Sequence, residues 1–367
     1  MEGSKTINRV IILILVSVLQ MAVSAVMLNN LSMENWSAVY AEDSGGYLLV
    51  ARYFLGEEIL PNSLPLLKYR LFCPVVPFIA SLLARLLPLE IAFLFLNGCF
   101  WLFSVFLFYQ FSKSLLREEL AFYCALLFTT SLPLIVWGLP IMVDVAAFFF
   151  AILNCLFITR FLSDKRQTYL ILVLTISLAI LTKPNLVSLC LFFVLYTVSQ
   201  KHYARIFPVV IGTLILIGGV YFYLGLGIGD FLTYGYLRHQ GLFYVLNALL
   251  FCFHWGLPLA IWGFWLDKNQ RNFYLSYLVS TFGCYLVFVH NPRLMFVIYP
   301  AVLPLIVRGM EACAHKLASR IQQKQEHTIS VLVASYMLTS NILAIVYLLI
   351  TRFYQYRSIE NLKDLLG

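Results

Sequence analysis

The stretch VDVAAFFFAILNCLFITRF, residues 143–161, decides how this chain folds. Between Asp144 near its start and Arg160 near its end, it contains no charged residue. At a rise of 1.5 Å per residue, a helix of this length covers about 28 Å, close to the ~30 Å thickness of the hydrocarbon core of a bilayer. The sequence therefore predicts a membrane-spanning helix here, with Asp144 at one end.

The composition extends this prediction to the whole chain. Of its 367 residues, 62% are hydrophobic and only 11% are charged, whereas soluble domains are about half apolar and about a quarter charged. Apolar stretches of spanning length recur from Val10 to Ile350, and they lack the short alternating segments of a membrane β-barrel. We therefore predict an all-α polytopic membrane protein.

The cations predict the orientation of the chain. Fifteen of the 25 Lys and Arg residues fall in six short segments that alternate with weakly charged ones, which is the positive-inside pattern of cytoplasmic loops. No basic cluster with interleaved aromatic residues stands in a soluble segment, so nucleic acid is not an expected partner. The six segments are Lys5/Arg9, Lys113/Arg117, Arg160/Lys165/Arg166, Lys201/Arg205, Lys268/Arg271 and Arg308/Lys316/Arg320/Lys324.

An even number of crossings must separate these segments, so residues 71–88 are expected to form an interfacial helix rather than a span. Residues 1–310 are then a transmembrane catalytic module whose first outer loop is 30–88, followed by a basic cytoplasmic loop, 311–327, and by the last span with a short outer tail, 328–367. The amino terminus would lie inside and the carboxyl terminus outside. About eleven spans are predicted, the first uncleaved: 10–29, 90–112, 119–138, 143–161, 168–183, 184–200, 206–227, 241–265, 272–290, 293–309 and 328–351.

The candidate functional groups gather on the predicted outer face. Such residues are costly near hydrocarbon unless they pair with one another or line a wet cavity, so they are candidates for a functional site. The group comprises Glu42, Asp43, Lys68 and Arg70 in the first outer loop, with Asp144, Lys183, Arg238, His290 and Arg293 further along the chain.

The order of short motifs along the chain resembles the GT-C membrane glycosyltransferases. This superfamily includes oligosaccharyltransferase catalytic subunits, protein O-mannosyltransferases and lipid A aminoarabinose transferases, and the resemblance covers about residues 5–310. It implies interfacial helices at about 44–56 and 71–88, an acidic residue in the first outer loop at Asp43, and a second acidic residue at Asp144. The motifs are EDSGGYLLVARYF (42–54), YRLFCPVVPFIASLL (69–83), VWGLPIMVDVAAFFF (136–150), LAILTKPN (178–185) and NPRLMFVIYPAVLPL (291–305).

The chemistry implied by the resemblance is transfer of a sugar from a polyprenyl-phosphate-type carrier to a lipid, glycan or protein acceptor outside the cytoplasm, by inverting displacement. Asp43 would be the base, with Asp144 as a second catalytic acid. Lys183, Arg293 and Arg70 would bind the donor phosphate, with Glu42, Lys68, Arg238 and His290 as helpers. Because the second motif offers one acid, a divalent cation held by Asp43 and Asp144 stays an open question.

Each candidate also has a structural explanation. Asp43 and Asp144 both stand where a helix N-cap is expected. Lys183 can extend its ammonium to the membrane surface, and Arg293 can anchor the end of a span. The eight cysteines show no CxxC spacing and fit small core residues better than disulfides or metal ligands.

Other functional classes remain open at this stage. A transporter or flippase for a lipid-linked substrate, or a polysaccharide polymerase, would share the many spans. A transporter would place charges near the bilayer midplane and would contain broken helices in corresponding halves. The charges near one face favour an integral multi-pass membrane enzyme with a non-cytoplasmic site, in contact with membrane lipids, and in the plasma membrane of a prokaryote rather than the endoplasmic reticulum.

Overall fold

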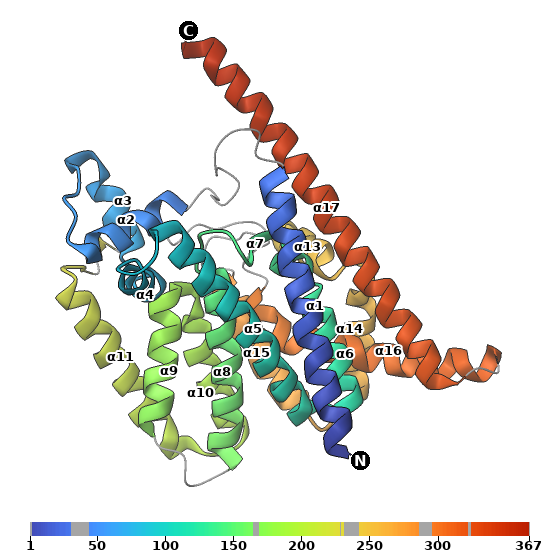
Figure 1. Ribbon diagram of the computed structural model, residues 1–367. Coiled ribbons are helices and arrows are strands. Elements are labelled where there is room, and N and C mark those ends of the chain that lie inside the picture. The colour runs from blue at the N-terminus through green and yellow to red at the C-terminus, as the bar shows by residue number, and fades with distance from the viewer. Residues whose placement is uncertain are drawn as a thin grey trace.

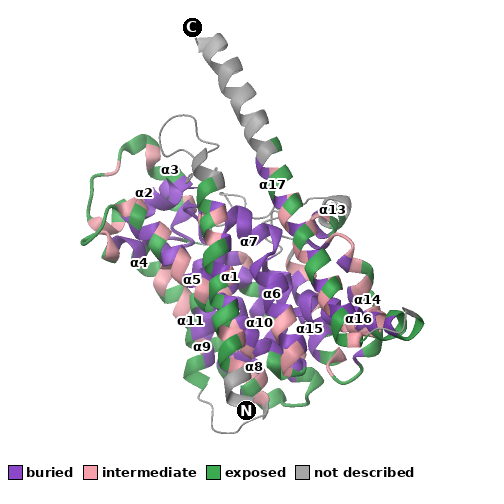
Figure 2. Ribbon diagram, turned by 45° about the vertical axis from the view of Figure 1, so that its right-hand side comes forward, coloured by how far each residue is buried: buried purple, intermediate pink, exposed green. Residues whose placement is uncertain are grey.

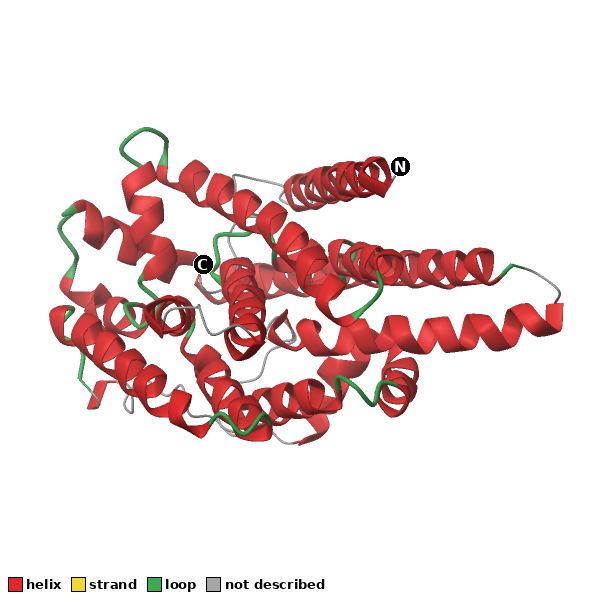
Figure 3. Ribbon diagram, turned by 90° about the horizontal axis from the view of Figure 1, so that it is seen from below, coloured by secondary structure: helices red, strands yellow, loops and turns green. Residues whose placement is uncertain are grey.

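The described part of the protein is a bundle of helices. The computed structural model describes residues 2–30, 44–163, 169–227, 229–230, 242–285, 296–321 and 324–366, and within them no strand occurs (Figures 1 and 3). The predicted all-α architecture is therefore confirmed. The longer helices are α1 (Glu2–Asn30), α5 (Leu89–Leu115), α8 (Asp144–Ser163), α11 (Ile206–Tyr223), α15 (Arg271–Tyr285), α16 (Tyr299–Ile321) and α17 (Gln325–Leu366). The shorter ones are α2 (Ser44–Leu55), α3 (Leu64–Arg70), α4 (Val75–Leu83), α6 (Glu118–Thr129), α7 (Leu132–Trp137), α9 (Tyr169–Thr182), α10 (Val187–Ser199), α13 (Leu242–Phe253) and α14 (Gly256–Leu266), with single 3-10 turns at Pro61–Ser63, Pro184–Leu186 and Tyr203–Arg205.

The predicted count of eleven spans is not confirmed. Within the described residues, six helices are long and apolar enough to cross a membrane, or up to eight if each of two bent helix pairs forms one span. The predicted span 119–138 is interrupted between α6 and α7, where Pro133 stands in the first turn of α7. The predicted spans 168–183 and 184–200 contain α9 and α10, which are apolar but short. Hydropathy records apolar length and is insensitive to such breaks.

The first loop contains helices at the two expected places. α2 begins at Ser44 and ends at Leu55, close to the predicted 44–56. The predicted helix over 71–88 is shorter than expected, because α4 covers only Val75–Leu83 and Arg85 lies in the turn after it. A further helix, α3, precedes it, and the segment Pro61–Arg70 meets α4 at an angle of 115°. α2, α3 and α4 lie together at the upper left of Figure 1.

Burial separates the inner helices from the outer ones (Figure 2). In the most apolar 18-residue stretch of the span that contains α16, 78% of the residues are buried. The corresponding share is 11% for the span that contains α11 and 22% for the one that contains α1. In a membrane the exposed apolar faces of α1 and α11 would be covered by lipid chains.

Two glycines bring α14 and α16 into backbone contact. A Cβ atom at Gly309 would clash with the carbonyl group of Leu259, and one at Gly263 would clash with that of Leu305. Small residues permit such close approach between membrane helices, where van der Waals contact replaces the hydrophobic effect as the driving force for association. The backbones of α14 and α16 are therefore held in direct contact.

The break between α13 and α14 is filled by α17. The two helices meet at 94°, and His254 at the break has a positive φ of 34°. The Nε2 atom of His254 lies 2.9 Å from the hydroxyl of Ser340, and its ring packs 4.1 Å from that of Tyr336. Since a Cβ at Gly256 would also collide with Tyr336, this break is packed with side chains.

Candidate active site

A buried ion pair joins the beginning of α8 to the end of α9. Asp144 is the first residue of α8, and Lys183 follows the last residue of α9. The Lys183 ammonium contacts Oδ1 of Asp144, and the two side chains are 13% and 1% exposed, respectively. Oδ2 of Asp144 is also buried and has no hydrogen-bond partner in the described part of the chain. A buried carboxylate oxygen left in this state is costly, which marks Asp144 as a functional candidate.

The segment before Asp144 is held by side chains instead of by regular backbone bonding. The amide of Asn97, on α5, donates to the carbonyls of Pro140 at 2.7 Å and Met142 at 3.2 Å. Gly138 packs against Trp101, since a Cβ there would lie 2.6 Å from the indole ring. Because buried carbonyls must be satisfied, these contacts fix the path of the chain into α8.

The first loop reaches the same segment through Ser44. Its hydroxyl donates to the carbonyl of Ile141 at 2.9 Å, although the two residues are 97 positions apart. Ser44 directly follows Asp43 in the chain, and Ile141 stands three positions before Asp144. The start of α2 and the start of α8 are thereby connected.

Arg70 lies on the other side of α2. It is 9% exposed, and its guanidinium stands over the rings of Tyr69 at 4.4 Å and Tyr47 at 5.1 Å. Its side chain also packs against Gly46, where an added Cβ would lie 2.6 Å from Cγ of Arg70. Gly46 therefore makes room for a cation beside the first turn of α2.

Lys68 is turned toward a different partner. Its ammonium lies 3.6 Å from Oδ1 of Asp230, in the segment after α11. The amide of Gly227 donates to Oδ2 of Asp230 at 2.9 Å, and this bond, together with Lys68, lowers the pKa of the carboxyl. Lys68 thus ties α3 to the segment that follows α11.

An apolar groove of about 600 Å³ opens between the loop helices and the bundle. One part of its lining comes from α11, and Leu181, two residues before Lys183 in the chain, also lines it. Its lining is Phe54, Pro74, Val75, Phe78, Leu181, Ile215, Leu216, Gly219, Val220, Tyr223 and Leu224.

The structure brings some of the predicted site residues together. Asp144 and Lys183 are in contact, while Arg70 packs on α2 and Lys68 pairs with Asp230. Glu42, Asp43, Arg238, His290 and Arg293 lie outside the described residues.

Ser44 and Asn97 are the two contributors that the sequence interpretation missed. Asn97 could have been noticed as a lone amide within the apolar run FLFLNGCFWLF (93–103). Ser44 carries no comparable signal, because a serine beside two glycines is ordinary at the start of a helix.

The described residues do not by themselves form a metal site. Among them no group of three or more His, Cys, Asp or Glu side chains is placed to hold an ion. Asp144 offers one buried oxygen, and its other oxygen contacts Lys183. A divalent cation at Asp144 would need further ligands, of which the sequence prediction names Asp43.

Comparisons with known proteins agree with this architecture. The family model described as dolichyl-phosphate-mannose-protein mannosyltransferase matches residues 72–223. No curated protein sequence matches the chain.

Solved structures resemble nine-tenths of the chain. ArnT from Cupriavidus metallidurans in the apo state superposes with a TM-score of 0.60 at 14% identity, covering 90% of this chain and 76% of that one. The same enzyme bound to undecaprenyl phosphate gives 0.58 at 15% identity, covering 90% and 70%. The oligosaccharyltransferase of Archaeoglobus fulgidus, tethered to an acceptor peptide, gives 0.54 at 11% identity, covering 90% of this chain and 55% of that one. The chain thus spans about half the length of the archaeal enzyme.

Proposed function

We propose that this chain, which has the fold of the GT-C membrane glycosyltransferases, transfers a sugar from a polyprenyl-phosphate-linked donor to an acceptor at the non-cytoplasmic face of the membrane. The family match and the shared fold support glycosyltransferase activity in general. The observation that carries the finer proposal is the buried pair of Asp144 and Lys183, in a chain that also has an apolar groove and a bond from Ser44 to the segment before Asp144. An apolar tail, a phosphate and an acidic group could meet at this point.

The groove suits the tail of the donor. Its lining is almost wholly apolar, and it lies between α11, whose outer face is exposed, and the helices of the first loop. A polyprenyl chain placed there would contact Leu181 in the last turn of α9, the helix that Lys183 follows. The structure of ArnT with undecaprenyl phosphate supports a carrier of this kind.

The proposed reaction is a displacement at the anomeric carbon. A carboxylate, assigned from the sequence to Asp43, removes the proton of the acceptor as its oxygen or nitrogen attacks that carbon. The bond from the anomeric carbon to the phosphate oxygen breaks, and its electron pair leaves with the phosphate. Attack opposite the leaving group inverts the configuration at the sugar.

Cations must balance the charge that develops on the leaving phosphate. Lys183 is held at the site by Asp144, so its ammonium can be shared between that carboxylate and an incoming phosphate. Arg70 supplies a second charge beside α2, and the sequence adds Arg293. If a divalent cation takes part, Asp43 and Asp144 are its proposed ligands.

The acceptor is proposed as a class: a lipid, a glycan or a protein that presents a nucleophile on the outer side. The arrangement of cations in the sequence supports this orientation, because the basic segments and the Asp144 end of α8 fall on opposite sides. The proposed location is the plasma membrane of a prokaryote.

A transporter would also contain broken helices, and two bent pairs occur here. The break at His254, however, is packed by Tyr336 and Ser340 of α17 instead of lining a cavity. The pair of α3 and α4 belongs to the first loop. The observed breaks therefore do not favour transport over transfer.

The deciding experiment measures donor consumption. Protein purified in detergent is incubated with a set of radiolabelled polyprenyl-phosphate sugars, and the release or transfer of label is followed. The proposal expects one donor to be consumed, and expects the double variant Lys183→Met/Asp144→Asn, which leaves no unpaired buried charge, to consume none while the protein stays folded. Consumption of none, together with substrate flux in proteoliposomes, would instead establish a transporter.

A further inference from the structure

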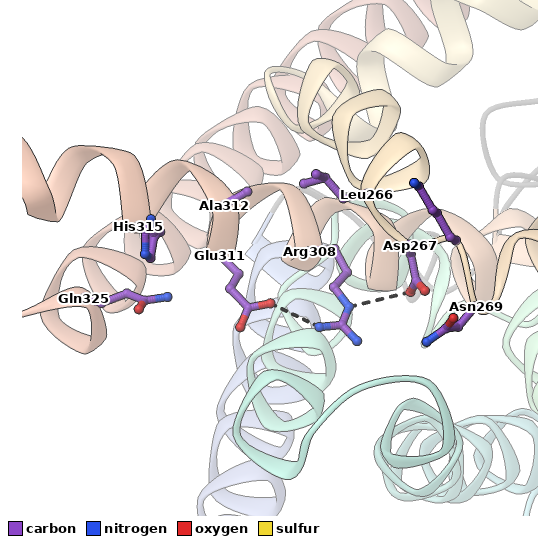
Figure 4. Close-up of a pocket in the computed structure, with 9 residues that line it drawn as sticks. Leu266, Asp267, Asn269, Arg308, Glu311, Ala312, His315 and Gln325 are labelled. Atoms are coloured by element: carbon purple, nitrogen blue, oxygen red, sulfur yellow. Dashed lines mark hydrogen bonds and ion pairs between the residues drawn. The ribbon is translucent and has the colours of Figure 1, made fainter.

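A polar pocket, separate from the apolar groove, lies at the opposite end of the bundle from Asp144. It has a volume of about 480 Å³ and lies between the end of α14, the segment before α15, the middle of α16 and the start of α17. Figure 4 shows Arg308 between Asp267 and Glu311, with His315 and Gln325 further along. None of these residues has a part in the proposed sugar transfer.

The position of the pocket follows from α5. Asn97, which holds the segment before Asp144, and Arg117, which contacts Glu311 of the pocket, are twenty residues apart along α5 and its end. At 1.5 Å per residue, this separation corresponds to about 30 Å, the thickness of the hydrocarbon core. The pocket therefore lies at the other membrane surface.

The two carboxylates in the lining are already neutralised. Nη1 of Arg308 lies 3.1 Å from Glu311, and Nε lies 3.6 Å from Asp267. Glu311 also accepts a hydrogen bond from Arg117 at 2.7 Å. By contrast, Lys268 and His315 line the pocket with no ion-pair partner among the described residues. An incoming anion would meet these two donors without having to displace a carboxylate.

The residues around the pocket are of the kinds that lie at the level of the lipid headgroups in membrane proteins. The ammonium of Lys316 stands 4.6 Å from the ring of Trp262, and the guanidinium of Arg271 stands 6.0 Å from that of Trp265. Trp265 is 66% exposed. Tryptophans flanked by cations mark the membrane–water interface, where the ring lies among the headgroups.

The charge of this end is positive. The segments 267–271 and 308–327 contain six cationic side chains and three carboxylates. Basic pockets between helices at a cytoplasmic surface attract anionic lipid headgroups. Two chemical sources offer the same phosphate, a phospholipid headgroup and a soluble phosphate, and the exposed apolar residues Leu266 and Trp265 beside the pocket favour the lipid.

We propose that this pocket binds the phosphate headgroup of an anionic phospholipid. Lys268 and His315 donate to the phosphate oxygens, while Asn269 and Gln325 face the polar remainder of the headgroup. The acyl chains lie along Leu266 and Trp265. The bound lipid would join α14, α16 and α17 at one surface.

The test titrates protein in neutral detergent with phosphatidylglycerol or phosphatidylcholine and counts bound lipid by native mass spectrometry. We expect one saturable site that prefers phosphatidylglycerol. Lys268→Gln should weaken it by about fivefold, and Lys268→Gln combined with His315→Gln should weaken it further. Arg320→Gln is the matched control, since Arg320 is exposed on α16 and does not line the pocket.

Three outcomes would overturn the proposal. Equal binding of the two lipids would remove the requirement for an anion. An equal loss in Arg320→Gln would show diffuse attraction instead of a site. Displacement of the lipid by millimolar inorganic phosphate or glycerol 1-phosphate would assign the pocket to a soluble phosphate. Unchanged melting temperatures of the variants, expected because Lys268 and His315 are exposed, separate lost binding from lost folding.

Discussion

The ammonium of Lys183 contacts Oδ1 of Asp144, so the residue after α9 is bonded to the first residue of α8. A buried ion pair contributes little net stability compared with apolar residues, but the loss of one partner leaves an uncompensated charge. The pair therefore makes the position of each side chain depend on the other.

Replacement of Lys183 by methionine tests this dependence. Lys183→Met should lower the free energy of unfolding by about 3–5 kcal/mol, because Asp144 is left buried without its cation. Adding Asp144→Asn to the same protein should restore most of that loss. Denaturant unfolding in detergent measures both effects, and a double variant no more stable than Lys183→Met would contradict the coupling.

Ser44 is expected to position Asp144 for the reaction. Ser44→Ala removes the hydrogen bond to Ile141, at a cost of about 1 kcal/mol in the free energy of unfolding. Sugar transfer should fall more strongly, by roughly ten- to a hundredfold in kcat, because small displacements of reacting groups are costly. Ser319→Ala is the matched control, since that hydroxyl donates to the carbonyl of Lys316 at the exposed end of α16. Wild-type kcat in Ser44→Ala would remove the positioning role.

Asp43→Asn separates capping from catalysis. Asparagine caps helices about as well as aspartate, so this variant should fold with a melting temperature close to that of the wild type. Asparagine cannot accept the proton of the acceptor, so transfer should fall by at least about a hundredfold. Activity with the purified variant is the measurement, and a fully active Asp43→Asn protein would exclude Asp43 as the base.

The contact between α14 and α16 predicts that replacement by alanine has different effects on stability at two glycines. Gly309→Ala places a methyl group against the backbone of Leu259 and should lower the free energy of unfolding by about 1–3 kcal/mol. Gly218→Ala, on α11, meets no atom within 4 Å and should be neutral or stabilising, because alanine favours a helix by about 1 kcal/mol over glycine. Thermal unfolding of the two variants side by side checks this, and equal losses would rule out the close contact.

The bond between Lys68 and Asp230 predicts a pH dependence. The Gly227 amide and the Lys68 ammonium lower the pKa of Asp230, so the folded state favours the ionised carboxylate. The ion pair between Lys68 and Asp230 is therefore fully formed above the ordinary pKa of an aspartate, about 3.9, and is lost as the pH falls below that value. An NMR titration of the Asp230 carboxyl should show a midpoint below 3.9, and Lys68→Gln should raise it. If the wild-type Asp230 carboxyl titrates at the ordinary pKa of an aspartate, the ion pair with Lys68 is contradicted.

The sequence was sufficient to predict the class of the fold, and the reason is physical. Apolar length determines where helices can cross a membrane, and the motif order indicated the superfamily whose fold the comparisons confirm. The predicted number of spans is not confirmed, and the backbone breaks inside apolar sequence at Ser131 and His254. Those breaks are stabilised by contacts between distant helices, such as His254 with Ser340, which local hydropathy does not report.

The candidate site was predictable only in part. Asp144 and Lys183 were identified because charged residues at the ends of apolar stretches require a partner, but their contact depends on α8 and α9 lying side by side. The same limit applies to Lys68, whose partner Asp230 is far away in the sequence. The role of Asp43 stays a prediction from the motif.

The double hydrogen bond of Asn97 has a consequence for how this protein can vary. One amide group donates to two carbonyls of a non-helical segment, so the loss of this amide would leave both carbonyls unpaired in an apolar interior. Insertions or deletions between Trp137 and Asp144 would move the two carbonyls away from the amide of Asn97, whose position is set by α5. The length of this connection is therefore expected to be fixed.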